Sequence, residues 1–144
     1  MKSVLQTDND TTTIIIRLIV GVIFLSEGVQ KFILPLERGA GRFEKIGFYY
    51  PEFFSSLVGS FEIVCGTLVI IGLLTRLAVI PLIYIMLIAL STTKYKLFMA
   101  TGFWNLLPES RTDWAMLLGG IFLLIEGAGQ WSFDKKINPN ESGK

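Results

Sequence analysis

Long apolar stretches separated by short polar segments dominate the pattern of this chain. Four such stretches are predicted to be helices, at about 14–34, 53–74, 77–98 and 113–131. A helix needs about 20 predominantly apolar residues to cross the hydrocarbon core of a bilayer. The pattern therefore predicts an all-α fold, a polytopic membrane four-helix bundle that lies in the lipid bilayer.

The segments between the first two predicted helices and between the last two mix charged and aromatic residues. Residues 36–52 include the run Phe48–Tyr50, and residues 100–111 include Phe103 and Trp104. Aromatic side chains are enriched where a bilayer meets water. We therefore expect an interfacial segment between helices 1 and 2, and a loop before helix 4.

The two ends of the chain are polar. Residues 1–13 are predicted to form a flexible tail and residues 135–144 a disordered one, which leaves 14–134 as a single membrane domain. Four crossings place both termini on the same side. We expect the cell (inner) membrane as the location and the cytoplasm as the side of the termini.

The composition excludes several classes of chemistry. Of the 144 residues, 51% are hydrophobic and 17% are charged, whereas soluble domains carry about a quarter charged residues. A net charge of +1 gives no support for nucleic-acid binding. Histidine is absent and Cys65 is the single cysteine, so an intrachain disulfide, a histidine-ligated haem and a histidine-dependent triad are excluded. We expect no metal site and no covalently bound cofactor.

Two carboxylates inside the predicted spans are the main candidates for function. Glu62 lies within the second span, where an ionised group costs about 2.5–3.5 kcal/mol on insertion scales. Gly59 and Gly66 share a helical face with Glu62, so this face is expected to pack against another helix. Glu27 in the first span lies about 10 Å from the same membrane surface as Glu62, which lies about 13 Å deep.

These two carboxylates are predicted to share an acidic cavity, with Lys31 or Lys94 as the counter-ion. Such a cavity can hold a proton, hydrogen-bond a quinone carbonyl or bind a cation. Two structural alternatives stay open. Glu27 and Lys31 can form an i,i+4 ion pair near the interface, and a protonated Glu62 can simply bond a neighbouring helix.

Three charged residues near the side of the termini are predicted to be structural. Arg17 lies about 5 Å and Glu126 about 6 Å from this membrane surface by helical rise. They are expected to form an ion pair, with Arg76 nearby. The alternative for Arg17 is a side chain that snorkels to the edge of the bilayer.

Three stretches taken together resemble DoxX-family membrane proteins. They are the run from Arg17 to Phe32, the residues from Glu62 to Ala78 with Gly47 and Pro51 before them, and the ending Gly127–Asp134. The resemblance implies a four-helix membrane fold. It also implies a link to quinones, because the family includes small subunits associated with thiosulfate:quinone oxidoreductase and with terminal quinol oxidase. Many members carry histidines near the ends of helices 1 and 3, where this chain has Glu27 and residues 92–94.

The leading hypothesis is a membrane subunit of a quinone-linked redox system that binds quinone or a redox partner through the acidic cavity. This role includes that of a non-catalytic subunit of a quinone oxidoreductase complex, and the sequence leaves open whether the chain is itself an enzyme. One alternative is a membrane scaffold that assembles partners through small-residue faces such as Gly119–Gly120. Another is a carrier of small organic or lipid molecules, for which a homodimer would supply further helices.

Overall fold

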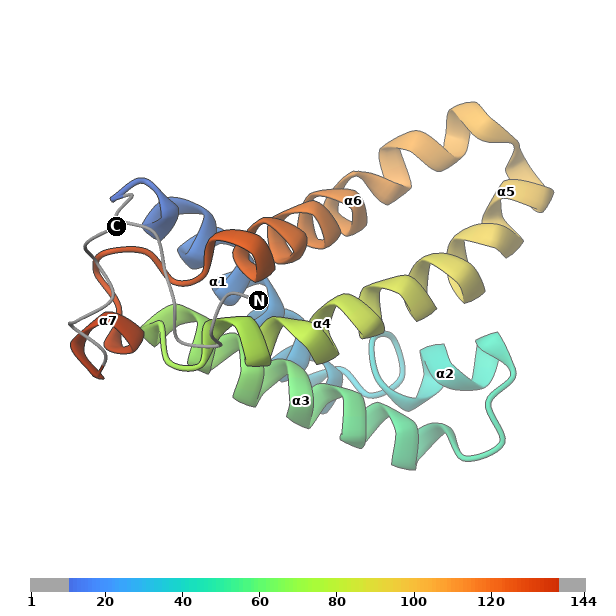
Figure 1. Cartoon of the computed structure of the whole chain (residues 1–144). Coiled ribbons are helices and arrows are strands. Elements are labelled where there is room, and N and C mark those ends of the chain that lie inside the picture. The colour runs from blue at the N-terminus through green and yellow to red at the C-terminus, as the bar shows by residue number, and fades with distance from the viewer. Residues whose placement is uncertain (1–10, 138–144) are drawn as a thin grey trace.

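The computed structural model describes residues 11–137, and the regular structure of these residues is helical (Figure 1). Residues 1–10 and 138–144, most of the two predicted tails, lie outside the described residues. The elements are α1 (Thr13–Ile33), α2 (Ala40–Ile46), α3 (Pro51–Ile71), α4 (Thr75–Ala89), the π-helix η1 (Leu90–Lys94), α5 (Tyr95–Thr101), α6 (Phe103–Glu126) and α7 (Phe133–Ile137).

Three helical segments are long and apolar enough to span a membrane: α1, α3 and the continuous run Thr75–Thr101, which consists of α4, η1 and α5. Helix α6 has 24 residues, but its first half is polar from Pro108 to Asp113. It runs back beside α4 to the end of the molecule where α1 begins (Figure 1). The all-α membrane fold is confirmed, while a complete crossing by α6 stays a prediction.

The prediction of a loop over residues 100–111 is wrong. Helix α5 continues to Thr101, and α6 begins at Phe103 after the single residue Gly102, which has φ of +81°. Most of the segment predicted as a loop lies in the first half of α6. Asp113, which follows this segment, forms an ion pair with Lys94, so the adjacent helical segment compensates its charge.

The far ends of two predicted elements also differ. The fourth helix ends at Glu126 rather than near residue 131, because Gly127 adopts φ of +85° and breaks the helix. Residues 135–137, predicted to belong to a disordered tail, form part of α7. The short connection between residues 126 and 133 returns the chain to the end of α3.

Helices α1 and α3 pack in antiparallel fashion through glycines. A Cβ atom placed on Gly28 would lie 2.8 Å from the carbonyl oxygen of Gly59, and one on Gly66 would lie 3.1 Å from that of Gly21. Glycines at these positions let the two backbones come closer than side chains would allow. This close packing sets the register in which the Lys31 side chain reaches Glu62.

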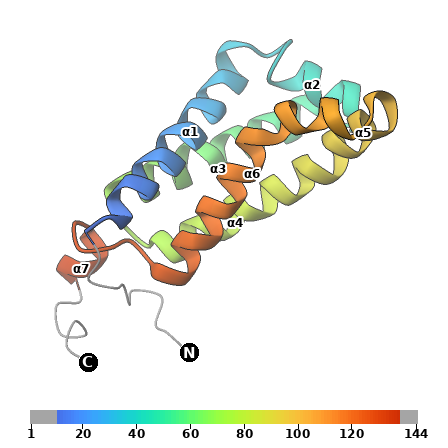
Figure 2. The same cartoon turned by 90° about the horizontal axis from the view of Figure 1, so that it is seen from above.

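The hydrophobic core lies where α1, α3, α4 and α6 meet (Figure 2). The packing of these helices buries apolar side chains between them. Exposed apolar residues lie on the outer faces, as expected for a surface that contacts lipid. The buried core residues are Val20, Phe24, Cys65, Val69, Ala78, Val79, Leu82, Met86, Met116, Leu117 and Leu123.

The corner between α3 and α4 is a tight turn, in agreement with the two residues left between the helices predicted at 53–74 and 77–98. Gly72 has φ of +72°, and Leu74 has φ of +49°, a strained value for a residue with a side chain. The Asp134 carboxylate accepts hydrogen bonds from the backbone N–H groups of Leu74 (2.6 Å) and Thr75 (3.1 Å). Asp134, which is distant in sequence, thus caps the start of α4 and accepts hydrogen bonds from N–H groups that have no partner within the helix.

Candidate functional site

The most buried ionic contact described joins α1 to α3. The Lys31 ammonium lies 2.5 Å from the Glu62 carboxylate, and the two side chains are only 8% and 2% exposed. Glu62 lies in the middle of α3, and Lys31 lies in the last turn of α1. Either charge alone would be very costly at this depth, so each makes the burial of the other tolerable.

Other charged groups surround this ion pair. Lys31 also approaches the backbone carbonyl of Glu27 at 3.5 Å, and the Glu27 carboxylate lies 3.7 Å from the guanidinium of Arg38. Glu27 and Arg42 both lie close enough to act electrostatically on Glu62. We call Glu27, Lys31, Arg38, Arg42 and Glu62 the charged cluster.

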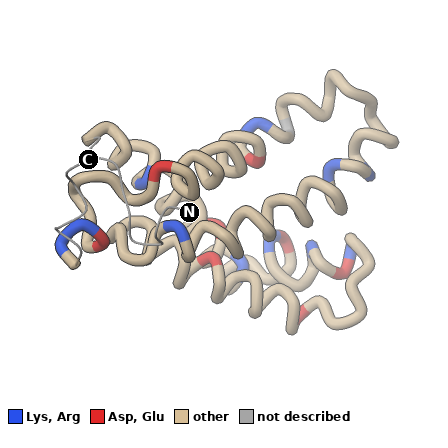
Figure 3. The backbone as a smooth tube through the Cα atoms, in the orientation of Figure 1, with Lys and Arg blue, Asp and Glu red and all other residues tan. Residues whose placement is uncertain are grey.

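The charged cluster lies where α1 ends and the short helix α2 packs against α3 (Figure 3). It combines three cationic groups with two carboxylates, so it offers hydrogen-bond donors and acceptors within an otherwise apolar region. The side chains of the cluster differ in exposure. Lys31 and Glu62 are nearly buried, whereas Glu27 and Arg38 are 30% and 47% exposed. A ligand entering from the membrane surface would meet the outer members first.

The structure selects between the two predicted counter-ions of Glu62. Lys31 occupies that position, whereas Lys94 forms an ion pair with Asp113 at 3.1 Å. Lys94 ends the π-helix η1, a rare helix form that is frequent at functional sites. Asp113 was not predicted as a partner, because the sequence placed it just after a loop instead of within α6.

At the opposite end, two arginines bond the last turn of α6 and the segment that follows it. Arg17 donates to the carbonyl oxygens of Ala128 and Trp131, both at 2.6 Å, and Arg76 donates to that of Ile125 at 2.6 Å. The predicted Arg17–Glu126 ion pair stays a prediction. These carbonyl bonds place both arginines close to the end of α6.

Sequence reasoning did not identify Asp134, Arg38 and Arg42. Asp134 belongs to the ending that resembles the DoxX family. Its capping of α4 joins it to Leu74 and Thr75, which are 60 and 59 positions away in the sequence. Arg38 and Arg42 lie on either side of the start of α2 and reach the charged cluster only through the packing of α2 on α3. Sequence spacing alone carries no signal for contacts of this kind.

Between residues 11 and 137, no group of three or more His, Cys, Asp or Glu side chains is placed to hold a metal ion. Cys65 is buried in the core as a free thiol. The charged cluster offers hydrogen-bond donors on its Lys and Arg side chains and acceptors on its Glu side chains.

The family model for DoxX matches residues 12–95, which include the whole charged cluster. The chain belongs to the DoxX family. Over 140 residues it is 47% identical to an uncharacterized membrane protein of Mycobacterium tuberculosis, Rv3486, covering 93% of this chain and 86% of the relative. The resemblance predicted from the sequence is thereby confirmed.

A second relative of this DoxX protein is CatD of Bacillus subtilis, which its name describes as a candidate oxidoreductase. The two chains are 30% identical over 116 residues, covering 81% of this chain and 79% of the relative. No solved structure matches the chain. Membership of the DoxX family and the apolar helices together make it a multi-pass membrane protein.

Proposed function

We propose that this DoxX-family protein is a membrane subunit of a quinone-linked redox system and that it binds a quinone headgroup at the charged cluster. The observation that carries the proposal is the buried ion pair of Lys31 and Glu62, 2.5 Å apart in a membrane-spanning pair of helices. Ionisable groups inside a membrane are costly, and they typically mark ligand or proton pathways. The name of CatD supports a redox context.

The chemistry of a quinone headgroup fits the members of the charged cluster. Its two carbonyl oxygens need hydrogen-bond donors, and the Lys31 ammonium and the Arg38 and Arg42 guanidiniums are donors. Reduction of a quinone to a quinol takes up two electrons and two protons. A partner oxidoreductase would supply the electrons, and Glu62 and Glu27 would exchange the protons with the membrane surface.

The scaffold alternative was predicted from the small-residue face at Gly119–Gly120, and this face is occupied by other helices of the same chain. A Cβ atom on Gly119 would lie 2.5 Å from Val20 of α1, and one on Gly120 would lie 3.1 Å from Ile83 of α4. These glycines therefore pack α6 inside the bundle and are not free to contact a partner. Assembly with redox subunits would have to use another face.

Quinone extraction from the purified protein tests the proposal. The wild type, Glu62→Gln and Glu52→Gln would be solubilised gently from quinone-containing membranes, and bound quinone would be measured by mass spectrometry. Glu52 is an exposed carboxylate in the first turn of the same helix, which makes Glu52→Gln the matched control. We expect quinone in the wild type and in Glu52→Gln, and its loss from Glu62→Gln.

A charge exchange separates binding from folding. The double variant Lys31→Glu with Glu62→Lys keeps an ion pair but moves the ammonium to α3. We expect it to fold, with a thermal midpoint near that of the wild type, and to lose quinone. Wild-type protein without quinone, or Glu62→Gln with full occupancy, would show that the ion pair only stabilises the contact between α1 and α3.

A further inference from the structure

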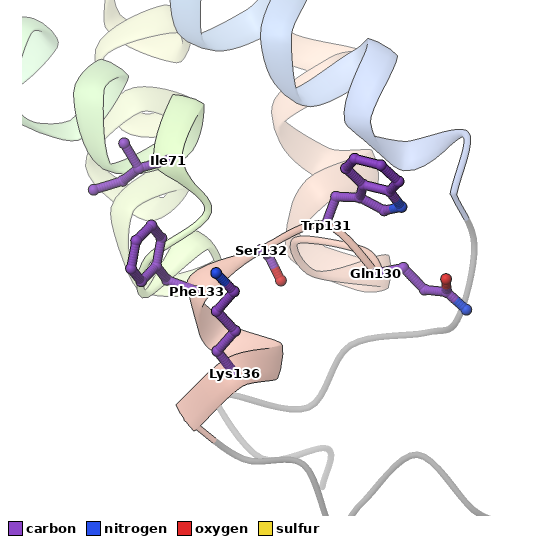
Figure 4. A pocket seen from close by; sticks show the side chains of 6 residues that line it. All are labelled: Ile71, Gln130, Trp131, Ser132, Phe133 and Lys136. Atoms are coloured by element: carbon purple, nitrogen blue, oxygen red, sulfur yellow. The ribbon is translucent and has the colours of Figure 1, made fainter.

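A shallow depression lies at the end of the molecule opposite the charged cluster, where α3 ends and the chain returns from α6 (Figure 4). Its volume is about 360 Å³. It is open to the surroundings, and three of its six lining residues are apolar. The residues that line it are Ile71, Gln130, Trp131, Ser132, Phe133 and Lys136.

The depression carries a single charged lining residue, the cationic Lys136. Its neighbour Asp134 is turned inward, where its carboxylate caps α4 and is only 2% exposed. The Lys136 ammonium lies 5.3 Å from the centre of the Phe133 ring, a cation–π arrangement that holds it over the depression. The Gln130 side chain points away from Lys136 (Figure 4), so Lys136 is the lining group that an anion would meet.

Hydrogen bonds fix the backbone that forms the walls. Arg17 holds the Trp131 carbonyl at 2.6 Å, and the Ser132 hydroxyl donates to the Gly129 carbonyl at 2.7 Å. The Asp134 N–H donates to the carbonyl of Gly72 at 2.9 Å. The depression is therefore preformed, so a ligand would not have to order it.

The position of the depression in the membrane indicates what fills it. Ile71 is the last residue of the spanning helix α3, so the depression lies where the hydrocarbon core meets the headgroups. Trp131 is 69% exposed and Phe133 is 50% exposed, a costly arrangement in water but a favourable one at this level. A molecule that meets both the cation and the apolar walls here must carry a negative charge next to apolar chains.

We propose that this depression binds an anionic phospholipid. The phosphate lies against the Lys136 ammonium, and the glycerol and the upper acyl chains pack against Ile71, Trp131 and Phe133. The site is independent of the proposed quinone function, because it lies at the other end of the molecule and shares no residue with the charged cluster.

Lipid competition in nanodiscs, followed by native mass spectrometry, tests this proposal. The full-length protein would be placed in mixtures of phosphatidylglycerol and phosphatidylcholine, and the retained lipids would be counted. We expect preferential retention of phosphatidylglycerol. Lys136→Gln should reduce that preference about five-fold, which corresponds to about 1 kcal/mol for one lysine near a charged surface.

Three further variants complete the design. Lys136→Arg should keep the preference, and Trp131→Ala should shorten lipid retention while keeping the preference for the anionic lipid. Lys45→Gln is the matched control, because Lys45 is an exposed lysine on α2 near the charged cluster. It should behave as the wild type does.

Equal retention of the two lipids by the wild type, or an unchanged preference in Lys136→Gln, would overturn the proposal. An equal loss in Lys45→Gln would also overturn it, since net charge alone would then explain the effect. Millimolar inorganic phosphate that displaced phosphatidylglycerol would identify a simple anion site in place of a lipid site. Retention that persists in phosphate would support the lipid.

Discussion

Gly28 and Gly59 face each other across α1 and α3 so closely that a Cβ atom on Gly28 would lie 2.8 Å from the carbonyl oxygen of Gly59. Because the helices are antiparallel, Lys31 faces Gly59 and Glu62 faces Gly28: a Cβ atom on Gly59 would lie 3.4 Å from the Lys31 Cβ, and one on Gly28 would lie 3.0 Å from the Glu62 Cβ. The short distance between the helices and the buried ion pair therefore depend on each other. The small residues bring the backbones together, and the ion pair satisfies the charges that this approach buries.

Gly28→Val tests the first half of this relationship. The added side chain would push α1 from α3, and overpacking of this kind costs about 1–3 kcal/mol. We expect a lower midpoint in a denaturation series in mixed detergent. Val29→Leu adds volume at the next residue, which is 37% exposed, and should leave the midpoint unchanged. Equal effects of the two substitutions would contradict close packing at Gly28.

Lys31→Met tests the second half. The substitution leaves the Glu62 carboxylate buried without its partner, and breaking a buried pair in this way costs about 3–5 kcal/mol. Adding Glu62→Gln to Lys31→Met removes the stranded charge and should recover most of that loss. A double-mutant cycle on the free energy of unfolding measures the coupling, and additive effects would show that the two side chains do not interact.

Asp134→Ala should destabilise the end of the molecule where α3 turns into α4. It removes the acceptor for the N–H groups of Leu74 and Thr75, and loss of a helix cap costs about 0.5–2 kcal/mol. Hydrogen exchange of these two amides should accelerate, while the amides in the middle of α3 stay protected. Exchange at Leu74 and Thr75 that matched the wild type would show that the cap contributes nothing.

Arg17→Lys should loosen the segment after α6. A lysine cannot bond the Ala128 and Trp131 carbonyls together as the planar guanidinium does. A hydrogen bond to a charged group contributes about 1.5–3 kcal/mol, so loss of one should raise the open fraction of the segment at least ten-fold. Trypsin cleavage at Lys135 and Lys136 reports that fraction. Arg111→Lys, at an exposed position on α6, serves as the control.

Local patterns in the sequence were sufficient to predict the membrane-spanning helices. Helix α1 was expected at about 14–34 and lies at Thr13–Ile33, and α3 was expected at about 53–74 and lies at Pro51–Ile71. The length of an apolar stretch and the glycine or proline near its ends are local properties. They determine where a helix crosses a bilayer without reference to the rest of the chain.

The first half of α6 and the partners of the charged residues depend on tertiary structure. Residues 100–111 were predicted to form a loop because of Gly102, Pro108 and their interfacial composition, which are local features. Helix α6 nevertheless begins at Phe103, and the Lys94–Asp113 ion pair joins it to an adjacent helical segment. The sequence narrowed the partner of Glu62 to Lys31 or Lys94. The choice came from the antiparallel register of α1 and α3, which the packing of their glycines sets.

By itself, then, the sequence determined that this is an all-α membrane protein of the DoxX type with ionisable groups inside its spans. Only the tertiary structure decided that Lys31 neutralises Glu62, that α2 adds cations beside them and that Asp134 caps α4. The physical reason is distance along the chain. Hydrophobic burial in a bilayer acts on each segment separately, but an ion pair or a cap needs two segments held within about 3 Å of each other.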